Sequence, residues 1–152
     1  MDKVIIVYAS LTGNTEEMAE LIAEGIRATG ATADLKVVDD CNAVILQKYD
    51  AFILGTYTWG DGEMPDEFLD FVDEMEELEL TGVVTSVFGS GDTTYPSFCG
   101  AVDELEEKLQ GWGAIIAQES LKVEFGPTME EKQLCREFGE KMVARLATEM
   151  GV

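Results

Sequence analysis

Short apolar runs alternate along the chain with segments of helical periodicity, and this alternation limits the possible fold more than any other feature. Three runs are largely apolar, as expected for interior strands covered on both faces, and they cover residues 3–8, 51–55 and 83–89. Residues 32–37 alternate polar with apolar side chains, which is typical of a half-exposed edge strand. Residues 114–117 begin a fifth strand that continues less regularly through residues 121–123. This order predicts an α/β fold with a five-stranded parallel sheet.

Four segments show apolar side chains at helical spacing. The first is expected to end near Gly30, a residue type favoured at the C′ position, and Pro65 is well placed to open the second. We expect their apolar side chains to pack in the core rather than to contact a cofactor. These side chains are Met18, Leu21, Ile22 and Ile26; Phe68, Leu69, Phe71, Val72 and Met75; Ala101, Val102, Leu105 and Leu109; and Leu134, Phe138, Met142 and Leu146.

A polar loop joins the first strand to the first helix. The first amides of a helix have no intrahelical acceptor and lie at the positive end of its dipole, so such a loop favours an anion. Its side chains include neutral donors but no Lys or Arg, which favours a phosphomonoester over ATP with magnesium. The alternative is an ordinary helix N-cap. The residues of this loop are Ser10, Leu11, Thr12, Gly13, Asn14 and Thr15.

Two further loops, residues 56–63 and 90–99, follow the third and fourth strands and should emerge at the same edge of the sheet. Each carries a large aromatic side chain among Gly, Thr and acidic residues: Trp59 in one and Tyr95 in the other. A flat conjugated ring between two aromatic side chains gains offset stacking of about 1 kcal/mol per contact beyond its burial. We therefore expect both side chains to stack a ring-shaped ligand; the alternative is that each only covers loop backbone. Residues 89–94 resemble a truncated dinucleotide fingerprint, but they lack its final Gly and place Asp92 where phosphate would lie, so we do not expect a dinucleotide site there.

Length and charge exclude several classes of function. A chain of 152 residues without a linker-like tract is expected to form a single domain, residues 1–152. The formal net charge of −21 disfavours binding to nucleic acid or anionic membranes, and like-charge repulsion favours a monomer. The sequence contains no membrane-span-length apolar stretch and no signal-peptide pattern, so we expect a cytoplasmic protein.

The residue types that are missing or scarce restrict the chemistry. The absence of His argues against hydrolytic triads and zinc catalysis. Cys41, Cys99 and Cys135 are odd in number and widely spaced, which fits neither a disulfide framework nor a metal site. A bound organic cofactor must then carry any chemistry.

Three motifs, each directly after a strand, are similar to those of the flavodoxin family. They are Ser10-x-Thr12-Gly13-Asn14-Thr15, Thr58-Trp59-Gly60-Asp61, and Gly91-Asp92-Thr93-Thr94-Tyr95 leading to Phe98-Cys99-Gly100-Ala101. The chain resembles a short-chain flavodoxin over essentially all of its length, because no sizeable insertion interrupts the fifth strand. The resemblance implies an open sheet of strand order 2-1-3-4-5 with helices on both faces. It also implies a non-covalently bound FMN and a role as a low-potential one-electron carrier rather than an enzyme.

The resemblance further implies which residues contact FMN. Trp59 would cover the inner face of the ring and Tyr95 the outer face, whereas Tyr57 stands where several relatives have a small hydroxyl residue. Phosphate and ribityl contacts are implied for Ser10, Thr12, Asn14, Thr15 and Thr58. Pyrimidine contacts, largely through backbone groups, are implied for Asp92, Ser97 and Cys99. The set of candidate cofactor-binding residues is completed by Leu11, Gly13, Thr56, Tyr57, Gly60, Asp61, Ser90, Gly91 and Phe98.

Two features suggest how such a carrier sets its potentials and chooses partners. Gly60 and Gly62 permit more than one turn geometry, and in flavodoxins the corresponding peptide turns toward flavin N5 and stabilises the neutral semiquinone. No basic residue lies between Lys48 and Lys108. The repulsion between a carboxylate and an anionic flavin about 10 Å apart is roughly 1.7 kcal/mol at a dielectric near 20. This repulsion destabilises the fully reduced flavin and so lowers the second reduction potential. The same acidity favours docking of a basic flavin reductase and other redox proteins.

Three other functions are weighed against an electron carrier. A catalytic flavodoxin-fold NAD(P)H or quinone oxidoreductase would need a nicotinamide site, for which the chain has no spare arginines or long insertions. A phospho-accepting receiver domain needs acids after the first and third strands, where Ala9-Ser10 and Thr56-Tyr57 stand. A flavin-free acidic binding module stays open at this point, and the colour of the purified protein would decide it.

Overall fold

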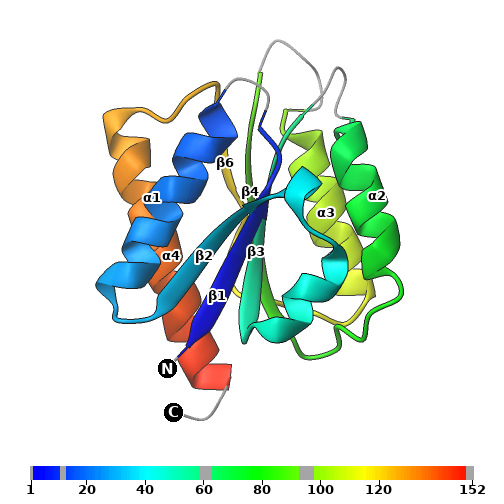
Figure 1. Cartoon of the computed structure of the whole chain (residues 1–152). Coiled ribbons are helices and arrows are strands. Elements are labelled where there is room, and N and C mark those ends of the chain that lie inside the picture. The colour runs from blue at the N-terminus through cyan, green and yellow to red at the C-terminus, as the bar shows by residue number, and fades with distance from the viewer. Residues whose placement is uncertain (1, 11–12, 59–62, 93–97, 150–152) are drawn as a thin grey trace.

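The computed structural model describes residues 2–10, 13–58, 63–92 and 98–149, which form a parallel sheet between two pairs of helices (Figure 1). The strands are β1 (Lys3–Tyr8), β2 (Thr32–Val37), β3 (Ala51–Tyr57), β4 (Val84–Gly91), β5 (Ile115–Ile116) and β6 (Leu121–Glu124). The helices are α1 (Asn14–Ala28), α2 (Asp66–Met75), α3 (Gly100–Gly111) and α4 (Met129–Glu149), and two short 3₁₀ helices are η1 (Val38–Asp40) and η2 (Ala43–Lys48).

The strand order is β2-β1-β3-β4-β5 and every pair is parallel, which confirms the predicted topology. The fifth position is divided between two segments: β5 pairs with Val84 and Thr85, and β6 pairs with residues 88–91 of β4. Between them the chain leaves the ladder at Gln118. The side-chain amide of Gln118 donates hydrogen bonds to the Phe138 carbonyl at 2.9 Å and to Ser86 Oγ at 3.4 Å. These bonds stabilise the break between β5 and β6.

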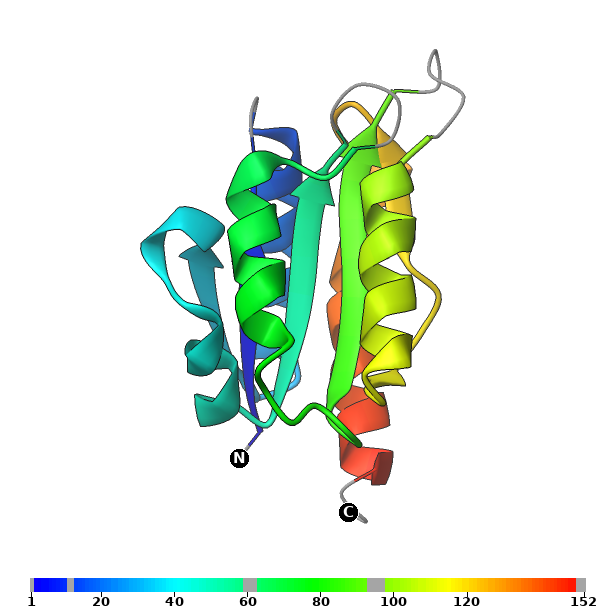
Figure 2. The ribbon, with the colours of Figure 1, turned by 90° about the vertical axis from the view of Figure 1, so that its right-hand side faces the viewer.

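Each face of the sheet packs against one pair of helices, as Figure 2 shows for α2 and α3. Successive side chains of a strand point to opposite faces, so Ile5 and Val7 of β1 enter the core under α2 and α3, whereas Val4 and Ile6 enter the core under α1 and α4. All four of these side chains are fully buried. Burial on both faces is why the interior strands read as continuous apolar runs.

Two apolar side chains expected in the core are instead exposed: Leu69 by 42% and Leu134 by 45%. The buried stripe of α2 runs through Phe68, Phe71, Val72 and Met75, and Leu69 lies one position outside it. Leu134 lies at the rim of a surface cleft that Leu121 and Phe138 also line. The other apolar helix positions predicted for the core are buried.

Helices α1 and α4 approach each other backbone to backbone at two glycines. A Cβ added to Gly25 would lie 2.0 Å from the Arg136 carbonyl oxygen, and one added to Gly139 would lie 2.2 Å from the Ile22 carbonyl oxygen. Any side chain at either position would push the helices apart. This contact holds the second half of α1 against α4, and the first turn of the same helix lies at the carboxyl edge of the sheet.

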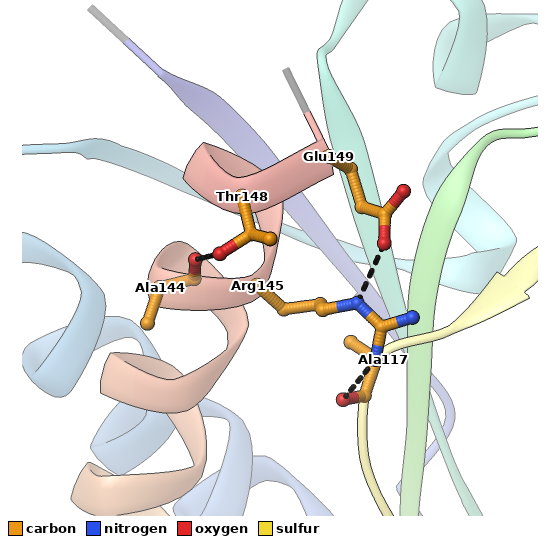
Figure 3. Close-up of polar contacts among 5 residues, drawn as sticks. All are labelled: Ala117, Ala144, Arg145, Thr148 and Glu149. Atoms are coloured by element: carbon orange, nitrogen blue, oxygen red, sulfur yellow. Dashed lines mark hydrogen bonds and ion pairs between the residues drawn. The ribbon is translucent and has the colours of Figure 1, made fainter. Parts of the chain in front are cut away.

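The C-terminal turns of α4 are tied to the sheet by Arg145 (Figure 3). Its Nε donates to Glu149 Oε1 at 2.9 Å, and another nitrogen of its guanidinium donates to the Ala117 carbonyl at 3.5 Å. The Thr148 hydroxyl donates to the Ala144 carbonyl at 3.1 Å. Although α4 has 21 residues, no helix in the described ranges is apolar enough over a sufficient length to cross a membrane.

Candidate functional site

The segments that follow β1, β3 and β4 all leave the sheet at its carboxyl edge, at the top of Figure 1. Strand β2 lies on one side of β1, and β3 lies on the other side, so the direction in which strands are added reverses at β1. Ligands of open parallel sheets bind at such a reversal. Candidate residues described at this edge are Ser10, Gly13, Asn14, Thr15, Thr56, Tyr57, Thr58, Ser90, Gly91, Asp92, Phe98 and Cys99. The other predicted site residues lie outside the described residues; they are Leu11, Thr12, Trp59, Gly60, Asp61, Tyr95 and Ser97.

The first segment forms a cap at the N-terminus of α1. Gly13 has φ 89°, a left-handed conformation that an L side chain rarely adopts, and its carbonyl accepts the Glu17 N–H at 2.9 Å. Ser10 Oγ accepts hydrogen bonds from the N–H groups of Gly13 and Glu16 at 3.1 and 3.3 Å. The amides of Asn14 and Thr15 precede the first intrahelical bond, so their acceptors must come from outside the helix.

One residue, Ser90, is hydrogen-bonded to both of the other segments. Its Oγ lies 3.0 Å from Thr15 Oγ1, and its carbonyl accepts the Thr58 N–H at 3.2 Å. Thr15 and Ser90 are 1% and 5% exposed, so their hydroxyl contact is shielded from water. The three segments predicted to share one edge are therefore joined there directly.

Several residues placed in loops by the sequence analysis belong to strands. Residues 56–57 extend β3 and residues 90–91 extend β4, because the backbone ladder continues through the pairs Thr56 with Gly89 and Tyr57 with Ser90. The Thr56 side chain is fully buried, and its hydroxyl donates to the Tyr57 carbonyl at 2.8 Å. These residues therefore support the site from within the sheet.

The side chains of Tyr57 and Thr58 differ in their partners. The Tyr57 hydroxyl donates to Glu67 Oε1 of α2 at 2.8 Å, and burial together with this bond raises its pKa from 10.0 to about 12. Thr58 Oγ1 is buried and has no hydrogen-bond partner among the described residues. A buried hydroxyl without a partner is costly, so Thr58 is a strong candidate to bind a ligand.

The third segment ends in a buried cysteine. Cys99 has φ 53° and precedes α3, and its thiol packs so close to Gly91 that a Cβ there would lie 3.0 Å from Sγ. Burial raises the pKa of the Cys99 thiol to about 12, which leaves it protonated and unreactive at neutral pH. Asp92 and Phe98, two other candidate residues of this segment, are half-buried. Any contact of Cys99 with a ligand would then come from its backbone, as the resemblance implies.

The sequence analysis missed a fourth segment at this edge. The Phe125 N–H donates to the Gly91 carbonyl at 2.9 Å, and a Cβ on Gly126 would lie 3.1 Å from Asn14 Oδ1. Phe125 has φ 55° and its side chain is 56% exposed. The Phe-Gly-Pro sequence was an available signal of a turn, because Pro127 disfavours the helical region for Gly126.

Negative charge is concentrated on α2, whose N-terminus faces the same edge (Figure 2). Within the described ranges, no ion pair involves a carboxylate of α2, and the cations Lys122, Lys132, Arg136 and Arg145 are paired with acids elsewhere. The uncompensated carboxylates of this helix are those of Asp66, Glu67, Asp70, Asp73 and Glu74.

Comparison with known proteins identifies the family. The family model described as "Flavodoxin" matches residues 6–139. The chain belongs to the flavodoxin family. It is 46% identical over 146 residues to "Probable flavodoxin 2" of Bacillus subtilis, an alignment that covers 95% of this chain and 97% of the relative. It is 42% identical over 134 residues to a flavodoxin of Maridesulfovibrio salexigens, covering 86% and 92%. The crystal structure of oxidised Flavodoxin 1 from Bacillus cereus superposes with a TM-score of 0.90 at 48% identity, covering 93% and 97%.

As a flavodoxin, the chain is an FMN-binding electron carrier and not an enzyme, and its partners are redox proteins. The predictions of family, fold, cofactor and function are thereby confirmed, and the comparisons give no support to the oxidoreductase alternative. The residues at the carboxyl edge fit the cofactor. A left-handed Gly13 opens α1, the buried Thr58 hydroxyl has no partner among the described residues, and the donors of the first segment are neutral.

Proposed function

We propose that the chain binds FMN with the phosphate at the N-terminus of α1, within a single domain of residues 1–152. The observation that carries this proposal is the buried hydroxyl of Thr58, which has no partner in the described part of the chain. A phosphate or ribityl oxygen would supply the missing hydrogen bond. In this proposal Ser10, Asn14 and Thr15 add donors from the cap of α1, which Ser90 joins to Thr58 through its bonds to Thr15 Oγ1 and to the Thr58 N–H.

The remaining residues complete the proposed site. When bound, FMN supplies reversible one-electron chemistry, and the protein positions the cofactor and limits the access of water to it. In our proposal Trp59 and Tyr95 stack the ring, Gly60 and Asp61 contact the cofactor from the loop after β3, and the backbone of Cys99 faces the pyrimidine. The other proposed contacts come from Leu11, Thr12, Gly13, Thr56, Tyr57, Ser90, Gly91, Asp92, Ser97 and Phe98.

Replacing Thr58 by Val tests the proposal, because it removes the hydroxyl and keeps the shape of the side chain. We expect FMN affinity to fall about 10-fold, the effect of one hydrogen bond to a charged group. The matched control is Thr85→Val in β4, since Thr85 Oγ1 is also buried without a partner in the described part of the chain but lies in the core. Thr85→Val should leave FMN affinity unchanged, as measured by titration of apoprotein with FMN. Equal affinities in the two variants would refute the role of Thr58.

We further propose that redox partners dock on α2 near its N-terminus. Each partner would contact this acidic helix with a cationic surface of its own, such as a basic flavin reductase would provide. Of the uncompensated carboxylates of α2, those of Asp66, Glu67 and Asp70 lie in the half of the helix that begins at the cofactor edge. Opposite charges steer association at low ionic strength, and this steering weakens as salt shortens the Debye length.

Neutralising one end at a time of the acidic segment formed by residues 66–77 separates docking from overall charge. Asp66→Asn, Glu67→Gln and Asp70→Asn together remove three charges next to the cofactor edge. As the control, Asp73→Asn, Glu76→Gln and Glu77→Gln remove three charges toward the other end of the same acidic segment. Stopped-flow electron transfer from a basic reductase, measured across salt concentrations, should lose its salt dependence mainly in the first variant. Equal losses would mean that only net charge matters.

We also propose that the protein is a cytoplasmic monomer. Like-charge repulsion from a net charge of −21 favours a monomer, which sedimentation at physiological salt would test. Cys41, Cys99 and Cys135 are all free thiols, as is usual in the reducing cytoplasm.

A further inference from the structure

We infer that Ser90 is a positioning residue: it donates its hydroxyl proton to Thr15 Oγ1 and so leaves the Thr15 proton directed to the FMN phosphate. This inference rests on the proposed position of the phosphate at the N-terminus of α1. It gives Ser90 a role through Thr15 in place of a direct contact with the cofactor.

The backbone holds Ser90 rigidly at the meeting point of the site. In the sheet ladder it pairs with Tyr57 of β3 on one side and with Val123 of β6 on the other. Its carbonyl accepts the Thr58 N–H at 3.2 Å, while its Oγ lies 3.0 Å from Thr15 Oγ1. Among the described residues, the partner of the Ser90 hydroxyl is Thr15 Oγ1.

Counting protons decides the direction of this hydrogen bond. The two hydroxyls carry two protons, but only one of these protons lies in the contact between them. If the Thr15 hydroxyl were the donor, it could donate to a phosphate only after that bond had broken. If Ser90 is the donor, the bond survives and the second proton, on Thr15, is available to an acceptor at the cap of α1.

A phosphate therefore selects the arrangement in which Ser90 donates to Thr15 and Thr15 donates to the phosphate. Phosphate oxygens only accept, and hydrogen bonds in such a chain polarise and strengthen one another. Both hydroxyls are more than nine-tenths buried, where this strengthening is not diluted by water. Ser90 thereby connects phosphate binding at α1 to Thr58 and the end of β4.

Ser90→Ala and Ser86→Ala form a matched pair for the test. Ser86 lies on the same strand and the same face, is fully buried, and its hydroxyl donates to Met142 Sδ of α4 at 3.2 Å. Both variants remove one buried hydroxyl bonded to a helix of the same layer, and Ser86→Ala also removes the acceptor of a 3.4 Å bond from Gln118, whose 2.9 Å bond to the Phe138 carbonyl stays. Ser86→Ala should therefore lower the urea midpoint of the apoprotein at least as much as Ser90→Ala. Only Ser90→Ala should weaken FMN binding, by about 3- to 10-fold, with riboflavin affinity changed less than about 2-fold.

A double-mutant cycle then isolates the chain of hydrogen bonds. Thr15→Val should weaken FMN binding less in the Ser90→Ala background than in the unmodified chain, because the donor has already been impaired. Additive effects, or equal FMN affinities for Ser90→Ala and Ser86→Ala, would overturn the inference. Failure of the proposed phosphate site would look different: the unmodified chain and Thr15→Val would then both bind FMN and riboflavin equally well.

Discussion

Replacing Gly139 by Ala should loosen the contact that sets the position of α1. The new methyl would lie 2.2 Å from the Ile22 carbonyl oxygen and 3.0 Å from the Ile26 amide nitrogen, and both are backbone atoms that no rotamer change can move. An ordinary contact between carbon and oxygen is about 3.3 Å or longer. The two helices must therefore separate locally by about 1 Å.

The loss in the free energy of unfolding depends on how far the separation of the helices weakens the packing of the side chains between them. A gap of 0.5–1 Å forfeits roughly a quarter to a half of each dispersion contact across it. The contacts at risk come from fully buried side chains such as Ile22, Ile26 and Met142. Overpacking of this kind costs about 1–3 kcal/mol, and the higher helix propensity of Ala returns about 0.5–1 kcal/mol. We expect a net loss of about 1 kcal/mol in the free energy of unfolding.

Urea unfolding of the apoprotein measures this loss, and FMN titration measures its effect on the site. Gly111→Ala in α3 is the control, because a Cβ there has no atom within 4 Å and should leave stability unchanged or slightly higher. Since α1 carries the proposed phosphate cap at its start, Gly139→Ala should also weaken FMN binding. If Gly139→Ala is as stable as Gly111→Ala, the argument from backbone contact is wrong.

Two further predictions concern a strained turn and the effect of high pH. Phe125→Gly should raise the free energy of unfolding by about 0.5–1 kcal/mol, because it relieves a left-handed conformation at an exposed site, whereas Phe125→Ala should not; urea unfolding of both checks this. The pKa values of Tyr8, Tyr49 and Tyr57 are each raised from 10.0 to about 12 by burial and a hydrogen bond to a carboxylate. Because the folded-state pKa is the higher one, their stabilisation is complete below pH 10 and is lost between about pH 10 and 12. Tyrosinate absorbance and urea unfolding across that range test it, and a tyrosinate rise of these three residues centred on pH 10.0 would contradict the assigned hydrogen bonds.

The sequence alone was sufficient for most of the sheet. The bounds of β1 and β2 agree with the prediction, because apolar runs and alternation report directly on which faces are buried. The ends of β3 and β4 were wrong by two residues, since ladder hydrogen bonds come from the backbone and continue through polar side chains such as Thr56 and Ser90. The division of the fifth strand depends on Gln118 bonding to α4, which no local pattern reveals.

At the site, the sequence predicted which segments meet but not how they are joined. Parallel strands bring their carboxyl ends to one edge, so the grouping of the three loops followed from topology. The contact of Thr15 with Ser90 joins residues 75 positions apart, and either hydroxyl alone looks like a ligand donor. The bond of Tyr57 to Glu67 was missed for the same reason: a phenol has many acceptors within reach in an acidic chain.

The interruption between β5 and β6 has a consequence for self-association. An exposed strand edge is a template on which another chain can add a strand, and long regular edges invite aggregation. Here that edge consists of runs of two and four residues, and the Ala117 carbonyl at the break already accepts a hydrogen bond from Arg145. At the opposite edge, β2 carries Asp34 and Lys36, whose charges resist stacking against an apolar strand. Both borders of the sheet are therefore poor templates for fibril growth, even when salt screens the charge repulsion between molecules.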